Sequence, residues 1–203
     1  MSGPTLGPRF ADALAYAADA HREQRRKGGP IPYVAHLLAV CALVIEDAAR
    51  SGALTEDLAI AALLHDVAED HGGEPRLADV RERFGPEVAR IVEACSDSLT
   101  EDAAARPPWR ERNEAYLAGL EHHDESVLRV SLADKLHNAR AIVADYAEVG
   151  DTLWERFSPE TDSVWYLHSV AVIIGRRLPG RQAGELMALV RELAERTGRT
   201  LPA

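Results

Sequence analysis

Residues 55–70 read TEDLAIAALLHDVAED, and this stretch decides the fold. Thr55 suits an N-cap, and the two acidic residues after it suit the first turn of a helix. From Leu58 to Leu64 every residue is apolar. Because a helix that is apolar on all sides belongs in the centre of a domain, the stretch predicts a central helix from Thr55 to about Asp70.

The rest of the 203-residue chain repeats helical apolar spacing. Aromatic residues make up only 5% of the chain and alanine is abundant, which favours helices over sheets. Further helices are expected over residues 10–27, 34–50, 77–84, 86–95, 107–122, 124–149, 159–178 and 181–197, with a short amphipathic piece at 151–157. The length fits one domain and no long linker divides it, so we expect an all-α, single-domain helical bundle over residues 1–203.

The formal net charge of −10 bears on the partners of the chain. A strongly acidic protein repels nucleic acid phosphates, so polymeric nucleic acid is not expected as a partner. Residues 1–8 lack the features of a signal peptide, and no apolar run approaches the roughly 20 residues that cross a bilayer. We therefore expect no membrane partner and a cytoplasmic protein. Cys41 and Cys95 are expected to be core residues rather than metal ligands.

Four ionisable residues end the apolar central helix: His65, Asp66, Glu69 and Asp70. Burying unpaired charges is costly, and a bound cation offsets that cost. His65 and Asp66 diverge by about 100° on a helix and still converge on one ion between them. Glu69 and Asp70 follow one turn later on the same faces. Taken alone, this pattern is also typical of the solvated end of a helix.

Two other segments offer similar side chains. His36 stands near the start of a helix, and Asp134 interrupts an apolar helix stripe with Asn138 four residues after it. Alone, His36 is as consistent with a capping or surface histidine, and Asp134 with an ordinary helix surface. Together with His65 and Asp66 they offer two imidazoles and two carboxylates. This set suits Mn²⁺, Fe²⁺ or Zn²⁺ and leaves open positions for water and a substrate oxygen.

Five segments in order carry a family resemblance: residues 21–27 (HREQRRK), 32–36 (PYVAH), 61–70 (AALLHDVAED), 84–88 (FGPEV) and 132–138 (LADKLHN). Over about residues 10–145 the chain resembles the HD superfamily of phosphohydrolases. More narrowly, it is similar to the hydrolase domain of RelA/SpoT-type alarmone enzymes and to the stand-alone small alarmone hydrolases. The resemblance implies an HD-type helical fold and a nucleotide as substrate.

The resemblance also implies a reaction: removal of the 3′-pyrophosphate from (p)ppGpp, which leaves GDP or GTP. It implies Mn²⁺ held by His36, His65, Asp66 and Asp134. Glu69 and Asp70 would flank the attacking water, and the sequence does not divide the general acid and base roles between them.

Substrate contacts follow from the same resemblance. Arg26 and Lys27 match a basic pair at the nucleotide, and Asn138 and Arg140 match positions that line the same pocket. Cations bind phosphate oxygens directly, although a basic helix end is also a common solubilising feature. Tyr33 is as consistent with stacking on a base as with packing in the core.

The chain departs from the family pattern at Leu37, at His71 and in the segments 95–98, 107–112 and 153–167. All four expected metal ligands are present despite these departures. The departures leave open whether the nucleotide substrate carries a guanosine. Two alternatives therefore stay open. One is an HD-type hydrolase for another nucleotide phosphate, such as an NADPH-like 2′-phosphate, and the other is a non-catalytic nucleotide-binding relic.

Overall fold

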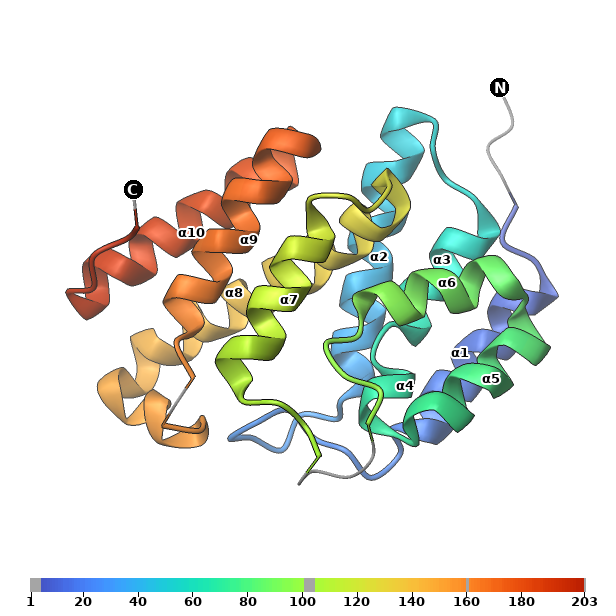
Figure 1. Cartoon of the computed structure of the whole chain (residues 1–203), viewed down its shortest axis with the longest axis horizontal. Coiled ribbons are helices and arrows are strands. Elements are labelled where there is room, and N and C mark those ends of the chain that lie inside the picture. Colours follow the sequence, from blue (N-terminus) through green and yellow to red (C-terminus); the bar gives the residue numbers. More distant parts are fainter. Residues whose placement is uncertain (1–4, 101–104, 160, 203) are drawn as a thin grey trace. The chain divides into compact units, whose positions relative to one another are not determined.

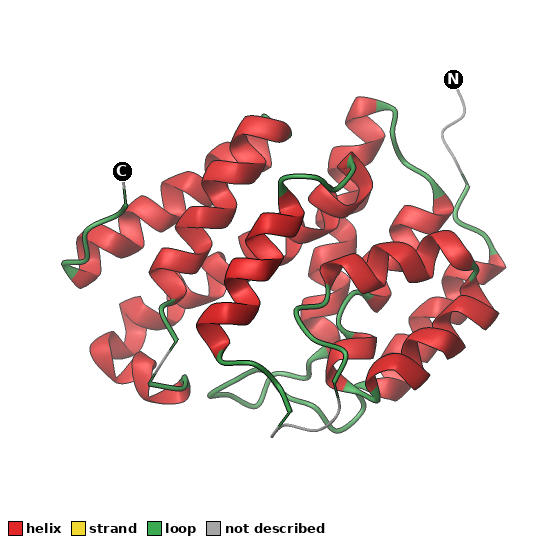
Figure 2. Ribbon diagram, in the orientation of Figure 1, coloured by secondary structure: helices red, strands yellow, loops and turns green. Residues whose placement is uncertain are grey.

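The computed structural model describes residues 5–100, 105–159 and 161–202. Regular structure in these residues is helical throughout, apart from one isolated bridge between Arg25 and Pro32 (Figure 2). The all-α prediction is confirmed. The chain divides into two compact units, Met1–Arg106 (unit 1) and Pro107–Ala203 (unit 2), so the expectation of a single domain stays a prediction.

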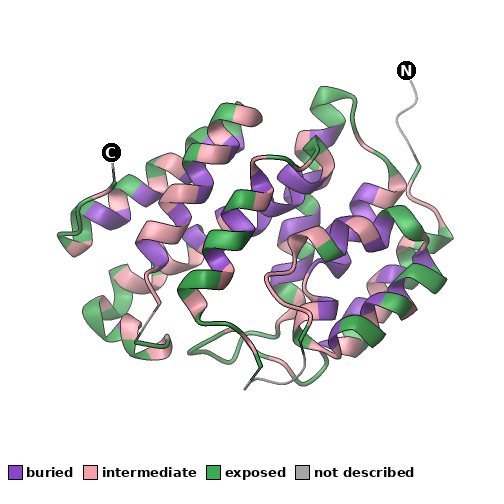
Figure 3. Cartoon of the chain, in the orientation of Figure 1, coloured by how far each residue is buried: buried purple, intermediate pink, exposed green. Residues whose placement is uncertain are grey.

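Unit 1 is built around the helix that the opening stretch predicts (Figure 1). Its helices are α1 (Pro8–Ala20), α2 (Val34–Ser51), α3 (Glu56–Leu64), α4 (Val67–Asp70), α5 (Gly73–Phe84) and α6 (Pro86–Cys95). The α3 helix packs against α1, α2 and α6, and all residues from Leu58 to Leu64 are buried (Figure 3). Its N-cap is Thr55, whose hydroxyl accepts a hydrogen bond from the Leu58 amide at 3.1 Å.

The prediction for the first helix is wrong at its end, because α1 stops at Ala20 rather than near Lys27. The chain folds back on itself over residues 24–33 instead. Gly28 adopts a φ of 80°, and the amides of Arg26 and Tyr33 bond to the carbonyls of Ile31 and Gln24 at 2.9 and 3.0 Å. These cross-turn bonds replace the helical ones, so the basic residues lie on a loop.

Unit 2 consists of α7 (Trp109–Leu120), α8 (Glu125–Val149), the 3-10 helix η1 (Gly150–Arg156), α9 (Ser163–Arg177) and α10 (Arg181–Thr197). The α8 helix packs against η1, α9 and α10, and Asp124 caps its start. A hydrophobic cluster of Val164, Leu193 and Ala194 joins the last two helices. The α7 and α9 helices begin two and four residues later than predicted, at Trp109 and Ser163.

None of the helices in the described ranges is both long enough and apolar enough to span a bilayer.

Candidate metal centre

The predicted helix over residues 55–70 is broken at His65 and Asp66. These two residues lie between the end of α3 and the start of α4. In a continuous helix the Ala62 carbonyl accepts a hydrogen bond from the Asp66 amide. Here the Nδ1 of His65 lies 2.9 Å from this carbonyl oxygen. The helical bond from the Asp70 amide to the Asp66 carbonyl, 2.9 Å long, restarts the helix. Asp66 and Asp70 are therefore joined by a helical hydrogen bond, one turn apart. The break between α3 and α4 separates His65 from Glu69.

Three of the predicted ligands come together in unit 1. His36, in the first turn of α2, and His65 are each buried, and both direct Nε2 at the Asp66 carboxylate. The Asp66 Oδ2 lies 3.5 Å from the His36 Nε2 and 3.0 Å from the His65 Nε2. The potential ligand atoms of the three residues all lie within 4.8 Å of one another. This group of His36, His65 and Asp66, called the triad below, has the residue types and the spacing of a metal site.

The donor set fits a divalent transition metal. In a metal-bound state, a His65 with its proton on Nδ1 would donate to the Ala62 carbonyl and offer the lone pair of Nε2 to the ion. A metal-bound histidine commonly has this arrangement, in which the second ring nitrogen is fixed by a carbonyl. Two imidazole nitrogens and one carboxylate oxygen suit ions such as Mn²⁺, Fe²⁺ or Zn²⁺.

Asp66 is held in its ionised form. Burial raises the pKa of this carboxyl, but the His65 charge and the hydrogen bonds from His36 and His65 more than offset that effect, and the pKa lies well below its usual range. Tyr33 adds a further donor, with its hydroxyl 2.6 Å from the Asp66 Oδ2. An ionised, oriented carboxylate is the form that binds a cation.

The two carboxylates after the break are each held by neighbours in unit 1. The Glu69 Oε2 accepts a hydrogen bond from the Asp97 amide at 2.9 Å, and the Asp70 Oδ2 accepts one from the Gln24 Nε2 at 2.8 Å. Partial loss of water and then the charge of Asp66 raise the pKa of Asp70. Both residues follow Asp66 within one helical turn, and Asp70 lies close enough to Asp66 to feel its charge.

The basic loop approaches the triad through Tyr33. The Arg26 guanidinium lies over the Tyr33 ring, 5.8 Å from its centroid. The ring also stacks on His21, with centroids 5.0 Å apart, while its hydroxyl bonds to Asp66. The half-buried Tyr33 thus contacts both His21 and a candidate metal ligand, which the sequence did not reveal. Lys27 lies next to Arg26 and is exposed.

The remaining predicted residues belong to α8 of unit 2. Asp134 is buried there, and its carboxylate bonds to Lys135 at 2.5 Å and to Asn138 at 2.6 Å. Burial lowers the pKa of Lys135, but the Asp134 charge more than offsets this and holds that pKa well above its usual range. Arg140 points elsewhere in the unit, to Glu185 on α10 at 2.6 Å.

Sequence reasoning missed a second polar group beside the triad. His21, Gln24 and His71 meet in unit 1 although His71 is 50 residues from His21. Burial lowers the pKa of His21 to about 4. The one available signal was that His71 departs from the family pattern, and nothing in the sequence pointed to its neighbours.

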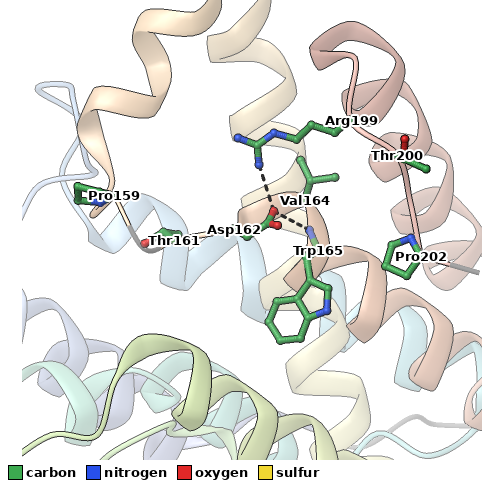
Figure 4. Close-up of a pocket in the computed structure, with 8 residues that line it drawn as sticks. All are labelled: Pro159, Thr161, Asp162, Val164, Trp165, Arg199, Thr200 and Pro202. Atoms are coloured by element: carbon green, nitrogen blue, oxygen red, sulfur yellow. Dashed lines mark hydrogen bonds and ion pairs between the residues drawn. The ribbon is translucent and has the colours of Figure 1, made fainter.

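A pocket of about 520 Å³ lies in unit 2, and none of the predicted site residues lines it (Figure 4). Its lining residues are Pro159, Thr161, Asp162, Val164, Trp165, Arg199, Thr200 and Pro202. The Arg199 guanidinium is paired with the Asp162 carboxylate at 3.1 Å, which also caps α9. The charges that line this pocket therefore neutralise each other.

Comparison with known proteins places the chain in a family. Residues 13–166 match the HD domain family. The chain is 30% identical to guanosine-3′,5′-bis(diphosphate) 3′-pyrophosphohydrolase MESH1 of Mus musculus over 192 residues, which cover 94% of this chain and 95% of the relative. The protein of the same name from Drosophila melanogaster is 35% identical over 136 residues, 65% of this chain and 68% of that protein.

A solved structure supports the fold. It is described as a metazoan ortholog of SpoT that hydrolyzes ppGpp and plays a role in starvation responses. The TM-score is 0.69 at 24% identity, with 97% of this chain and 99% of that chain covered. Because the family match spans most of the chain and the mouse relative aligns with nearly all of it, the chain belongs to the HD domain family, in the group that contains MESH1.

Proposed function

We propose that this chain is a metal-dependent phosphohydrolase that removes the 3′-pyrophosphate from (p)ppGpp, leaving GDP or GTP. The observation that carries the proposal is the triad of His36, His65 and Asp66, whose potential ligand atoms lie within 4.8 Å of one another. The relation to MESH1 along nearly the whole chain supports the choice of substrate, since the name of that relative states this activity.

The metal in this proposal is Mn²⁺, with Asp134 as the fourth ligand. The carboxylate of Asp134 is buried and pairs with the Lys135 ammonium group, and a deprotonated carboxylate is the form that binds a metal ion. When bound, such an ion polarises a phosphoryl oxygen and lowers the pKa of a bound water.

Glu69 and Asp70 are the proposed catalytic carboxylates. The Asp97 amide holds the Glu69 carboxylate and the Gln24 side chain holds the Asp70 carboxylate, and both residues follow Asp66 within one helical turn. From there they orient the attacking water and accept or return its proton.

Arg26 and Lys27 are the proposed phosphate contacts. An acidic chain must supply local cations for a substrate that carries two pyrophosphates. Arg26 lies over the ring whose hydroxyl bonds to Asp66, so a phosphate bound by Arg26 would be near the triad. Tyr33, Asn138 and Arg140 complete the proposed substrate contacts, and Arg140 would have to leave Glu185 to take part.

The test is release of pyrophosphate from ppGpp by the purified protein with Mn²⁺, run beside GTP with the same readout and beside NADPH with release of orthophosphate as the readout. We expect turnover of ppGpp that Asp66→Asn abolishes. Asp57→Asn is the matched control, because Asp57 lies on the first turn of α3 and makes only a surface ion pair with Arg9 in the contacts described for it. Turnover of NADPH in place of ppGpp, or none of either, would refute the assigned reaction.

The ligand assignment has its own test. Asp134→Asn should weaken Mn²⁺ binding, measured by calorimetry, while Asp145→Asn on the same helix should not. Asp145 pairs with Arg156 at 2.7 Å and is partly exposed. Unchanged Mn²⁺ affinity in Asp134→Asn would remove this residue from the ligand set and leave the assigned reaction standing.

A further inference from the structure

A second group of potential ligand atoms lies in unit 1, apart from the triad. It consists of His21, Asp70 and His71, whose ligand atoms lie within 4.8 Å of one another. His21 follows the last residue of α1, whereas Asp70 ends α4 and His71 follows it. The turn after α4 places His71 there, because Gly72 and Gly73 both adopt positive φ angles, 110° and 53°, that other residues rarely adopt.

The atoms at the centre of this group are spaced like the ligands of one ion. His21 Nδ1 and His71 Nε2 lie 3.1 Å apart, and the Gln24 Oε1 lies 2.5 Å from the first and 2.8 Å from the second. Neighbouring ligands bound at about 2.0–2.1 Å are about 2.8–3.0 Å apart in octahedral geometry and about 3.3–3.4 Å apart in tetrahedral geometry. The spacing of the two nitrogens lies between these two ranges. The two distances from the Gln24 Oε1 to these nitrogens are those of hydrogen bonds, and a bound ion would lengthen them.

Gln24 connects the two histidines to the carboxylate. Its Oε1 faces both imidazoles, and its Nε2 donates to the Asp70 Oδ2 at 2.8 Å. The cluster therefore offers two imidazole nitrogens, an amide oxygen and a carboxylate oxygen. Such a set suits borderline divalent ions such as Zn²⁺.

His21 is built into the fold as a ligand requires. It is 2% exposed and stacks on Tyr33, which fixes the plane of its ring. Within the described residues its Nε2 has no hydrogen-bond partner, so the side chain makes its polar contacts at Nδ1, inside the cluster.

We propose that His21, His71 and Asp70, with Gln24, form a second divalent metal site next to the triad, with Zn²⁺ as the ion that its chemistry favours. An ion there would draw the Asp70 carboxylate toward the two imidazoles. The site is defined by contacts within unit 1 and does not rest on the proposed hydrolysis of (p)ppGpp, so either proposal can fail without the other.

The test is the number of Zn²⁺ ions bound per chain, measured by equilibrium dialysis of chelator-treated protein and elemental analysis. We expect two ions for the unmodified protein, one for His71→Ala, one for Asp66→Asn, and none for the double variant. His168→Ala is the matched control, since this partly buried histidine of α9 belongs to neither group, and it should keep two ions. Equal Zn²⁺ content in His71→Ala and the unmodified protein would show a hydrogen-bonded cluster only and overturn the proposal.

A second variant keeps the test decisive if His71→Ala folds poorly. Gln24→Glu replaces a neutral ligand oxygen by a charged one between the same partners. At a metal site it should tighten Zn²⁺ binding in the Asp66→Asn background at least several-fold. In a purely hydrogen-bonded cluster it would place two carboxylates together and leave Zn²⁺ binding absent, which would also overturn the proposal.

Discussion

Replacing Tyr33 by phenylalanine tests the link between the basic loop and the metal centre. The substitution removes only the hydroxyl that donates to the Asp66 Oδ2 at 2.6 Å and leaves the ring stacked on His21. A hydrogen bond to a charged group contributes about 1.5–3 kcal/mol. If this energy holds the carboxylate in its ligating orientation, its loss weakens Mn²⁺ binding about 10- to 100-fold.

The assay is a calorimetric Mn²⁺ titration of Tyr33→Phe, with far-UV circular dichroism as a check of folding. Tyr146→Phe is the matched control, because the Tyr146 hydroxyl also donates to a carboxylate, that of Asp151 at 2.9 Å, but in unit 2 and on the surface. We expect no change in Mn²⁺ affinity for the control. An affinity of Tyr33→Phe within about threefold of the unmodified protein would refute the reasoning. A raised KM with unchanged metal affinity would instead assign Tyr33 to the substrate alone.

Three further predictions concern stability, measured by urea unfolding. Leu63→Ala in the fully buried α3 should lose about 2–5 kcal/mol, whereas Leu38→Ala, at a residue 46% exposed, should lose no more than about 0.5 kcal/mol. Lys135→Met leaves the buried Asp134 carboxylate without its cation and should cost about 3–5 kcal/mol. Arg140→Met, on the same helix, breaks the more exposed pair with Glu185 and should cost less than about 1 kcal/mol. Equal losses of stability in the two variants would contradict this prediction. Burial lowers the pKa of His21 to about 4, below the roughly 6.5 of a histidine in an unfolded chain. The contribution of His21 to the free energy of unfolding is therefore fully present above about pH 6.5 and falls by about 3 kcal/mol as the pH approaches 4. The metal-free His21→Gln variant should lack that part of the acid destabilisation.

Much of the architecture was predictable from local patterns. The all-apolar run from Leu58 to Leu64 predicted a buried central helix, and α3 is buried there. The capping by Thr55 followed from its position before two acidic residues. These features depend on neighbours within one or two helical turns, which periodicity reports directly.

The features that were missed depend on tertiary contacts or on contacts between a side chain and the backbone. At the break between α3 and α4 the His65 imidazole lies 2.9 Å from the Ala62 carbonyl oxygen, and the apolar pattern of the sequence does not reveal this contact. His21 and His71 meet across 50 residues. No spacing rule connects such a pair, so the second cluster became visible only in three dimensions.

The break between α3 and α4 has a consequence for local stability. A single helical turn such as Val67–Asp70 does not persist in water by itself, and its order must come from the contacts at its two ends. One end carries Asp66 and the other carries Asp70, which belong to the two candidate metal groups. Amide hydrogen exchange over residues 67–73 should therefore follow metal occupancy, while the exchange of α3, which is anchored by its buried apolar residues, follows global unfolding.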